Sequence, residues 1–257
     1  MSIALATYSL WHRELVRFFR QRSRIIGALG SPLVFWLLIG SGLNRSFAGG
    51  PSLPVGGYLE FFYPGTLVLI LLFTAIFSTI SIIEDRQEGF LQGVLVAPVP
   101  RAAIVLGKIL GATTLAVVQG VIFLVLAPLA GVPIPLAHIP AVVGAMVLVA
   151  FGLSGLGFVI AWSLDSTQGF HAIMNVFLIP LWILSGALFP ASGAAGWVRA
   201  LMMANPVTYG VSSIRQLLYD QPLGSEPSLT VSLAVTAIFA AAMLGAGAWA
   251  VTRESRR

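Results

Sequence analysis

The sequence predicts an all-α polytopic membrane protein with six transmembrane helices. Of its 257 residues, 58% are hydrophobic and only 9% are charged, and the mean hydropathy is +0.95. In a soluble domain about a quarter of the residues are charged. Six stretches reach the roughly 20 mostly apolar residues that a helix needs to cross a bilayer. They are residues 25–43, 62–83, 105–128, 140–162, 171–190 and 229–251.

The distribution of basic residues predicts that both termini are cytoplasmic (N-in/C-in). Six spans place the two termini on one side of the membrane. With the N-terminus inside, eleven Lys and Arg residues are cytoplasmic and three, Arg45, Arg199 and Arg215, are external. This bias follows the positive-inside rule. A secretory signal peptide fits poorly, because the charged region would be unusually long and no small-residue cleavage site follows the apolar run.

The N-terminal segment, residues 1–24, has the spacing of an amphipathic helix. Its basic positions recur at four, three and four: Arg13, Arg17, Arg20 and Arg24. Its apolar positions recur at three, four and three: Tyr8, Trp11, Leu15 and Phe18. At 100° per residue the two sets lie on opposite faces, which predicts an interfacial helix with aromatic side chains in lipid and arginines toward the headgroups. This helix could serve only to anchor the topology of the chain, or it could also contact a partner protein; the sequence leaves both roles open.

Motifs for catalysis or ATP binding are incomplete. Gly107-Lys108 resembles the end of a phosphate-binding loop, but Ala102 replaces its first glycine and Ile109 replaces the Ser or Thr. A Ser nucleophile elbow near residue 154 fails because Leu156 occupies its last glycine position. The three histidines are scattered and the chain has no cysteine, so metallopeptidase, thiolate and disulfide chemistry lack support.

Charged side chains are absent from the inner portions of the six predicted spans. A proton or ion relay usually places such groups at depth. The sequence therefore disfavours ion-coupled transport, and the energy for any active process has to come from another molecule. One membrane domain is expected over residues 1–257, because no linker, low-complexity tract or repeat divides the chain.

Charges gather between the second and third spans. Glu84 to Glu88 carry four charged side chains, and the apolar residues Leu91, Val94 and Leu95 follow at helical spacing. Pro98 and Pro100 then end the helix. We expect residues 84–101 to hold a short helix across the cytoplasmic surface with one face for a partner. An ordinary charged loop is the alternative.

The segment from Glu84 resembles the corresponding loop of ABC-2-type transporter permeases. The shared pattern is Glu84-x-x-x-Glu88-Gly89-x-Leu91-x-x-x-Leu95-x-x-Pro98-x-x-Arg101, ending in Gly107-Lys108. The run 185–190 at the end of the fifth span, and an external segment carrying Asn205, Pro206, Tyr209 and Arg215, are also similar to this family. The resemblance covers essentially the whole chain.

The resemblance implies that residues 84–101 form a coupling helix, seated in a cleft of a separate ATP-binding subunit. The residues implied are Glu84, Asp85, Arg86, Glu88, Gly89, Leu91, Leu95, Pro98 and Arg101. Leu91 and Leu95 would be the buried contacts with that subunit, while Arg101 and Lys108 would hold the return to the bilayer. The external segment, residues 191–225, is too polar to span, and we expect short re-entrant helices there, packed within protein.

The same resemblance implies the permease subunit of an ATP-driven exporter in the inner (cytoplasmic) membrane of a prokaryotic-type cell. The chain would be a translocase subunit rather than an enzyme and would hold no cofactor, with ATP and Mg²⁺ bound by two copies of the ATP-binding subunit. A second permease copy, identical or homologous, would complete the complex. The expected cargo is amphipathic or lipid-like: a drug, a lipid or a lipid-linked glycan. The family's path would be lined here by Phe73, Phe77, Asn175 and Phe177.

Two other classes of function remain as alternatives. A passive channel or structural membrane component would need no ATPase. A membrane-embedded enzyme would need a polar catalytic pair at depth, which the sequence does not offer.

Overall fold

The computed structural model describes residues 2–20, 22–47, 57–132, 134, 136–220 and 226–254, with only the backbone of residues 22–29, 31, 44–47, 130 and 254. These residues form helices joined by turns, and no strand occurs among them. The first six helices are α1 (Ile3–Arg20), α2 (Arg22–Phe47), α3 (Tyr58–Ser78), α4 (Ser81–Gln87), α5 (Phe90–Val96) and α6 (Arg101–Leu124). The others are α7 (Ile139–Trp162), α8 (Thr167–Trp182), α9 (Gly196–Ala204), α10 (Pro206–Tyr219) and α11 (Leu229–Glu254).

Short irregular helices connect these elements. Turns of 3-10 helix occupy Ala127–Ala130, Leu136–His138 and Ala191–Gly193. A π-helical turn, Ile183–Ala187, follows α8 directly. Within that turn Gly186 has a φ of 79°, a left-handed conformation that a residue with a side chain adopts only at a cost.

Five stretches of the described chain are long and apolar enough to cross a membrane. They are Tyr58–Gln87, Arg101–Leu124, Leu136–Trp162, Thr167–Ala187 and Leu229–Arg253. Each corresponds to one of the predicted spans. The first predicted span, residues 25–43, lies in α2, whose described apolar part is the shorter Pro32–Leu43. An all-helical multi-pass chain is thus confirmed, while the count of six spans stays a prediction.

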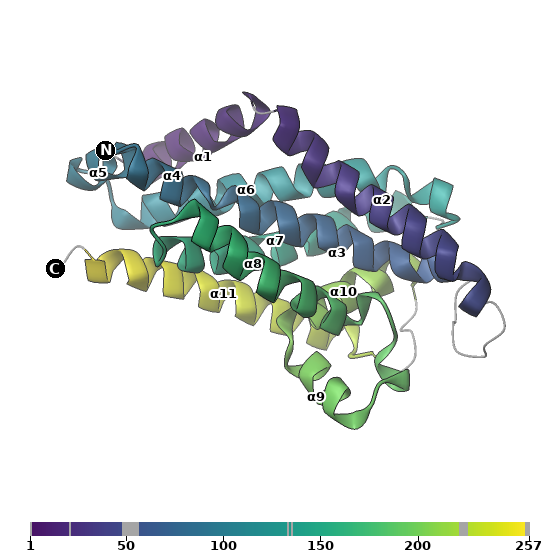
Figure 1. Cartoon of the computed structure of the whole chain (residues 1–257). Helices are drawn as coiled ribbons and strands as arrows, with labels where there is room; N and C mark the ends of the chain where they lie inside the picture. Colours follow the sequence, from purple (N-terminus) through teal and green to yellow (C-terminus); the bar gives the residue numbers. More distant parts are fainter. Residues whose placement is uncertain are drawn as a thin grey trace.

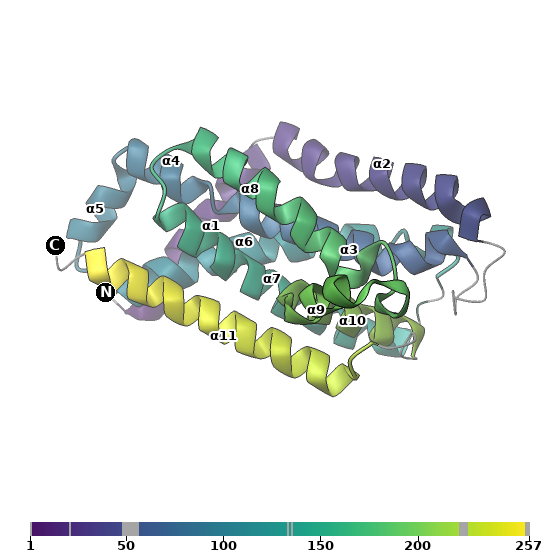
Figure 2. The ribbon, with the colours of Figure 1, turned by 60° about the horizontal axis from the view of Figure 1, so that its bottom comes forward.

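α3 is the central helix of the bundle (Figure 1). Its sequence is apolar on all sides, as expected for a helix that other helices surround. Tyr63 stacks on Phe123 of α6 with ring centroids 4.7 Å apart, and its hydroxyl donates to the Phe123 carbonyl at 2.7 Å. Trp36 of α2 meets the Tyr63 ring edge-on at 5.9 Å. α2 and α11 lie on opposite sides of the bundle (Figure 2).

The fold satisfies a backbone carbonyl that a proline leaves unpaired. Pro64 inside α3 has no N–H for the carbonyl of Glu60, four residues earlier. Tyr219, at the end of α10, donates its hydroxyl to this carbonyl at 2.6 Å. One turn further on, Trp182 of α8 donates its indole N–H to the Gly65 carbonyl at 2.8 Å. These two hydrogen bonds attach α10 and α8 to the first turns of α3.

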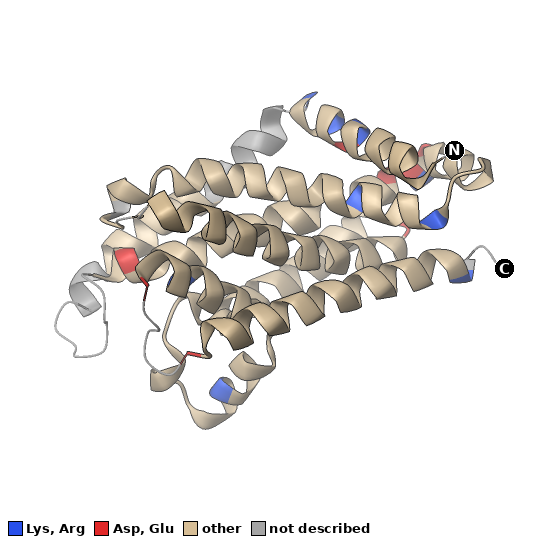
Figure 3. Cartoon of the chain, turned by 180° about the vertical axis from the view of Figure 1, so that it is seen from behind, with Lys and Arg blue, Asp and Glu red and all other residues tan. Residues whose placement is uncertain are grey.

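The start of α1 and the end of α11 lie at the same end of the bundle as α4 and α5 (Figure 1). Most of the charged residues lie along the chain at this end, which we call the charged end (Figure 3). α9 and α10 lie toward the opposite end, called here the far end. With nine and fourteen residues they are too short to span a bilayer, so the expected short helices are present, apart from 221–225, which fall outside the described residues.

The contact between α3 and the π-helical turn yields a test of the packing. A Cβ atom on Gly65 would lie 2.6 Å from the Cβ of Ala187, whereas one on the exposed Gly144 of α7 would meet nothing within 4 Å. We expect Gly65→Ala to lower stability by about 1–3 kcal/mol through overpacking, and Gly144→Ala to raise it by up to about 1 kcal/mol. Thermal midpoints of the two purified variants in detergent measure this, and equal midpoints would contradict the packing described.

Candidate functional site at the charged end

The carboxylate of Asp85 is the centre of the charged end. Its side chain, near the end of α4, is fully buried. Arg13 of α1 donates to both of its oxygens, at 2.8 and 2.6 Å, and Arg17 donates to one of them at 2.7 Å. Lys108 of α6 also donates to Asp85. Four charge-assisted hydrogen bonds from two helices therefore converge on one carboxylate.

Lys108 joins a second carboxylate to this centre. Its side chain is 3% exposed, and its ammonium group donates to Glu14 of α1 at 2.6 Å and to Ser81 of α4 at 3.2 Å. Ser81 in turn donates its hydroxyl to the other oxygen of Glu14 at 2.7 Å. Buried charges are tolerated only when they are paired and hydrogen-bonded, and here each partner is supplied by a different helix.

Arg17 extends the network toward solvent, pairing with Glu84 at 2.9 Å and with Glu88 at 3.3 Å. We define the ion-pair cluster as Arg13, Glu14, Arg17, Glu84, Asp85 and Lys108. Three cations face three carboxylates in it, so its formal charge is zero. Burial disfavours the charged form of Arg13, but the hydrogen bonds and negative charge of Asp85 outweigh this and raise the pKa of its guanidinium above the ordinary value.

Small residues on α6 let α1 approach closely enough to form the cluster. A Cβ on Gly107 would lie 2.6 Å from that of Leu10, and one on Gly111 would lie 2.8 Å from that of Glu14. Four residues separate the members of each pair, so the two glycines meet one face of α1. On the same surface Trp11 donates its indole N–H to the Thr114 hydroxyl at 3.0 Å.

These contacts give Trp11, Arg13, Arg17 and Phe18 surroundings other than the predicted ones, whereas Tyr8 on the same predicted aromatic face is 57% exposed. Arg13 and Arg17 bind carboxylates of this chain instead of headgroups, and Trp11 and Phe18 face protein instead of lipid. Arg20, the last residue of α1, is exposed as predicted. Helical spacing separates two faces but does not say whether lipid or protein covers each. Arg24 belongs to α2, which begins at residue 22, and its side chain lies outside the described part of the chain.

The predicted single coupling helix over residues 84–101 is two short helices. α4 continues the α3 span and carries Glu84, Asp85 and Arg86, and Glu88 caps its end. Gly89 then has a φ of 78°, which turns the chain sharply into α5. After Pro98 the chain enters α6, where Arg101 donates to the Leu95 carbonyl at 3.0 Å.

α5 presents a different face from the one expected. Leu91 is 3% exposed and belongs to the core of this chain, so its side chain is not free for a separate subunit. The guanidinium carbon of Arg13 lies over the ring of Phe90, 3.7 Å from the centroid of that ring. Leu95 is half-buried, and the exposed apolar side chain is Val96 at 88%. Sequence spacing identified an apolar face but not which molecule covers it.

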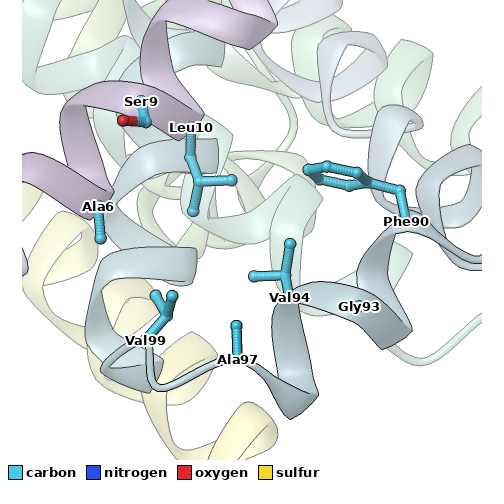
Figure 4. A pocket seen from close by; sticks show the side chains of 8 residues that line it. All are labelled: Ala6, Ser9, Leu10, Phe90, Gly93, Val94, Ala97 and Val99. Atoms are coloured by element: carbon cyan, nitrogen blue, oxygen red, sulfur yellow. The ribbon is translucent and has the colours of Figure 1, made fainter. Parts of the chain in front are cut away.

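An apolar groove of about 310 Å³ lies between α1 and α5 (Figure 4). Its walls are Ala6, Ser9, Leu10, Phe90, Gly93, Val94, Ala97 and Val99. The one hydroxyl among them, that of Ser9, donates to the Leu5 carbonyl at 2.9 Å. The groove therefore offers apolar contact beside the exposed end of α5.

The residues predicted for a substrate path fall into two groups. Phe73 and Phe77 of α3 are half-buried with centroids 5.6 Å apart, and Phe77 stacks on His171 of α8 at 5.2 Å. Asn175 and Phe177 lie on the exposed face of α8, with Phe177 66% exposed. Whether either group contacts a substrate stays a prediction.

The residues predicted for the external segment have structural partners at the far end. Asn205 accepts from the Val207 N–H at 2.9 Å, capping α10, which begins with Pro206, and it donates to the Leu181 carbonyl at 2.6 Å. Tyr209 donates its hydroxyl to the Met203 carbonyl at 2.8 Å.

Arg215, predicted on the external side of the membrane, lies at the far end and is 1% exposed. It donates to the Gly186 carbonyl at 2.9 Å, pairs with Glu226 and lies 4.4 Å from the ring centroid of Phe61. The guanidinium therefore joins the π-helical turn, the start of α3 and the segment before α11.

The protein-family comparison matches residues 6–219 to the model described as ABC-2 type transporter. The matched region includes the ion-pair cluster, α5 and α10. The chain belongs to the ABC-2 type transporter family.

Curated relatives agree with this family. The chain is 26% identical over 212 residues to a protein named as transport permease ycf38 of Cyanophora paradoxa, covering 82% of this chain and 73% of the relative. It is 25% identical over 239 residues to the daunorubicin resistance ABC transporter permease protein DrrB1 of Streptomyces coeruleorubidus, covering 90% and 81%. Nodulation protein J of Sinorhizobium fredii is 24% identical over 222 residues, covering 84% and 82%.

Within this ABC-2 chain, sequence reasoning missed Glu14 and Ser81 and gave Lys108 a lesser role. Glu14 lies four residues from both Leu10 and Phe18 on the buried face of α1. A carboxylate inside an apolar face signals a buried cation elsewhere in the fold. Lys108, placed just inside an apolar span, is the matching signal. Spacing within the chain could not pair the two, because 94 residues separate them.

The ion-pair cluster can be tested by removing its most buried cation. We expect Lys108→Met to lower the free energy of unfolding by about 3–5 kcal/mol, because Glu14 and Asp85 both lose their most buried cationic partner. Adding Glu14→Gln should restore part of the loss, with a coupling energy above about 1 kcal/mol. Denaturant unfolding in mixed micelles measures both. Arg20→Met, at an exposed position of α1, is the control, and a Lys108→Met effect no larger than this control would contradict the cluster's role.

Proposed function

We propose that this chain is the permease subunit of an ATP-driven ABC exporter, with the charged end facing the cytoplasm. The observation that carries the proposal is the exposed tip of α5 on a segment anchored by the ion-pair cluster. Val96 is 88% exposed at that tip, while Asp85 behind it is fully buried. Because the ion-pair cluster fixes α4 to α1 and α6, a protein that pushed on the tip of α5 could move these helices. Family membership supports an ATP-binding subunit as that protein.

The proposed complex contains two ATP-binding subunits and two permease copies, identical or homologous, in the inner membrane of a prokaryotic-type cell. ATP and Mg²⁺ belong to the ATP-binding subunits, because the phosphate-loop pattern is incomplete here. This chain acts as a translocase subunit and not as an enzyme. Among the described residues no group of His, Cys, Asp or Glu has a metal-binding arrangement.

The cluster explains how movement of α5 would reach the spanning helices. α4 is bound through Asp85 to α1 and to α6 at the same time. α4 also continues from α3 through a turn at Thr79 and Ile80, where the backbone angles stay helical. Since packed helices move as rigid units, displacement of α5 would shift α1, α4 and the start of α6 together.

The proposed cargo is amphipathic or lipid-like: a drug, a lipid or a lipid-linked glycan. The similarity to a relative named for daunorubicin resistance supports this class. The apolar surface of α8, where Val176 is 68% and Phe177 66% exposed, is compatible with such a molecule. The alternative function, a passive channel or structural component, would need no ATPase and would leave the tip of α5 without a partner.

Charging the tip of α5 tests the proposal. We expect Val96→Asp to reduce association with a co-expressed cognate ATP-binding subunit, and to lower vanadate-sensitive ATP hydrolysis in lipid nanodiscs at least tenfold. Thermal stability should stay unchanged, because the side chain is exposed. Leu129→Asp is the matched control, since Leu129 is 78% exposed in the turn that follows α6, away from the charged end.

Two outcomes would contradict the proposal. Full ATP hydrolysis by the Val96→Asp complex would remove α5 as the docking element. Absence of any associated ATPase with the unmodified chain, in all lipids tested, would instead favour the passive channel or structural component.

A further inference from the structure

We infer that Arg86 is a positioning residue that transmits movement of α4 and α5 to the start of α8. The inference rests on the proposed function and adds a route within the chain. Arg86 follows Asp85 directly on α4, and the two side chains bind different parts of the molecule. Asp85 binds α1 and α6. The guanidinium of Arg86, which the family resemblance assigned to the contact with an ATP-binding subunit, binds the turn between α7 and α8 of this chain instead.

Arg86 forms hydrogen bonds to three residues at this turn. Its guanidinium donates to the carbonyls of Trp162 at 2.8 Å and Leu164 at 3.2 Å, and to the carboxylate of Asp165 at 2.8 Å. It also lies 5.4 Å from the ring centroid of Trp162. These acceptors include carbonyls at the C-terminal end of α7, where the helix dipole favours a cation. Neighbouring Gln87 adds a bond to the Asp165 carbonyl at 2.8 Å.

The turn that Arg86 binds connects directly to α8. Asp165 is followed by Ser166, whose hydroxyl accepts from the Gly169 N–H at 3.2 Å and caps the helix. Only the N-cap residue Ser166 therefore lies between Asp165, an acceptor of Arg86, and the first residue of α8. A shift of the turn would be passed on to the helix itself.

α8 is suited to move because it is attached along one line of side chains. Its buried residues, Phe170, Met174, Leu178 and Trp182, recur every four residues. The other side is exposed and carries Val176 and Phe177. At the other end of this route, a turn with i→i+3 hydrogen bonds at Thr79 and Ile80 joins α3 to α4, and a tilt of α4 with α5 would bend the chain there.

A purely structural role for Arg86 predicts different behaviour. If the side chain only caps α7, its loss would lower thermal stability, ATP hydrolysis and movement of α8 in parallel. If it transmits movement, its loss would leave docking and ATP hydrolysis intact and abolish only the response of α8. A readout on α8 itself separates the two roles and needs no knowledge of the cargo.

The experiment uses the complete complex in nanodiscs with one reporter on α8. Because the chain has no cysteine, Val176→Cys gives a unique site for a spin label. The spectrum is recorded with and without ATP and vanadate, for otherwise unchanged Arg86, for Arg86→Met and for Arg86→Lys. Arg253→Met on α11 is the matched control, an Arg at the same end that stacks on Trp249.

We expect vanadate trapping to change the spectrum of the complex with Arg86 and of the Arg253→Met control. Arg86→Met should lose at least four-fifths of this change while keeping ATP hydrolysis within twofold. Arg86→Lys should recover part of it, because an ammonium group satisfies fewer acceptors than a guanidinium. A full spectral change in Arg86→Met would overturn the inference, and so would parallel losses that follow a lower thermal midpoint. No ATPase association with the complex containing Arg86 would contradict the proposed function itself.

Discussion

Burial of the Asp85 carboxylate is the constraint on which the charged end depends. A carboxylate with no exposure is unstable in a protein interior unless cations and donors surround it. Its partners come from α1 and α6, so these helices and α4 have to assemble together. Gly107 and Gly111 provide the close approach that places Glu14 beside Lys108. The position of α5, the apolar groove and the exposure of Val96 all follow from this assembly.

The far end is organised by a different requirement, the pairing of backbone carbonyls where helices are interrupted. Pro64 frees a carbonyl in α3, and the π-helical turn Ile183–Ala187, which follows α8, is distorted at Gly186. The side chains of Tyr219, Asn205 and Arg215 supply donors to these regions. Through these hydrogen bonds α10 connects α3 to α8 and to the π-helical turn after it. Interruptions of this kind are compatible with a membrane only where protein supplies the missing hydrogen bonds.

Hydropathy alone predicted the helical class and the positions of α3, α6, α7, α8 and α11, because length and apolarity suffice for a spanning helix. It also located the non-spanning segment that holds α9 and α10. It failed where an apolar or basic face could be covered by either lipid or protein. Arg13 and Leu91 were assigned to headgroups and to a partner, yet both are satisfied within the chain. The ion pair between Glu14 and Lys108 could not be predicted from spacing, because the two residues are distant in sequence.

The central claim is that α5 at the charged end docks onto an ATP-binding subunit, and the accessibility of its tip tests this most directly. Val96→Cys, as the only cysteine in the chain, can be labelled with a membrane-impermeant maleimide in nanodiscs. We expect rapid labelling of the isolated chain and at least tenfold slower labelling once the ATP-binding subunit is bound. Equal rates with and without the bound subunit would contradict it.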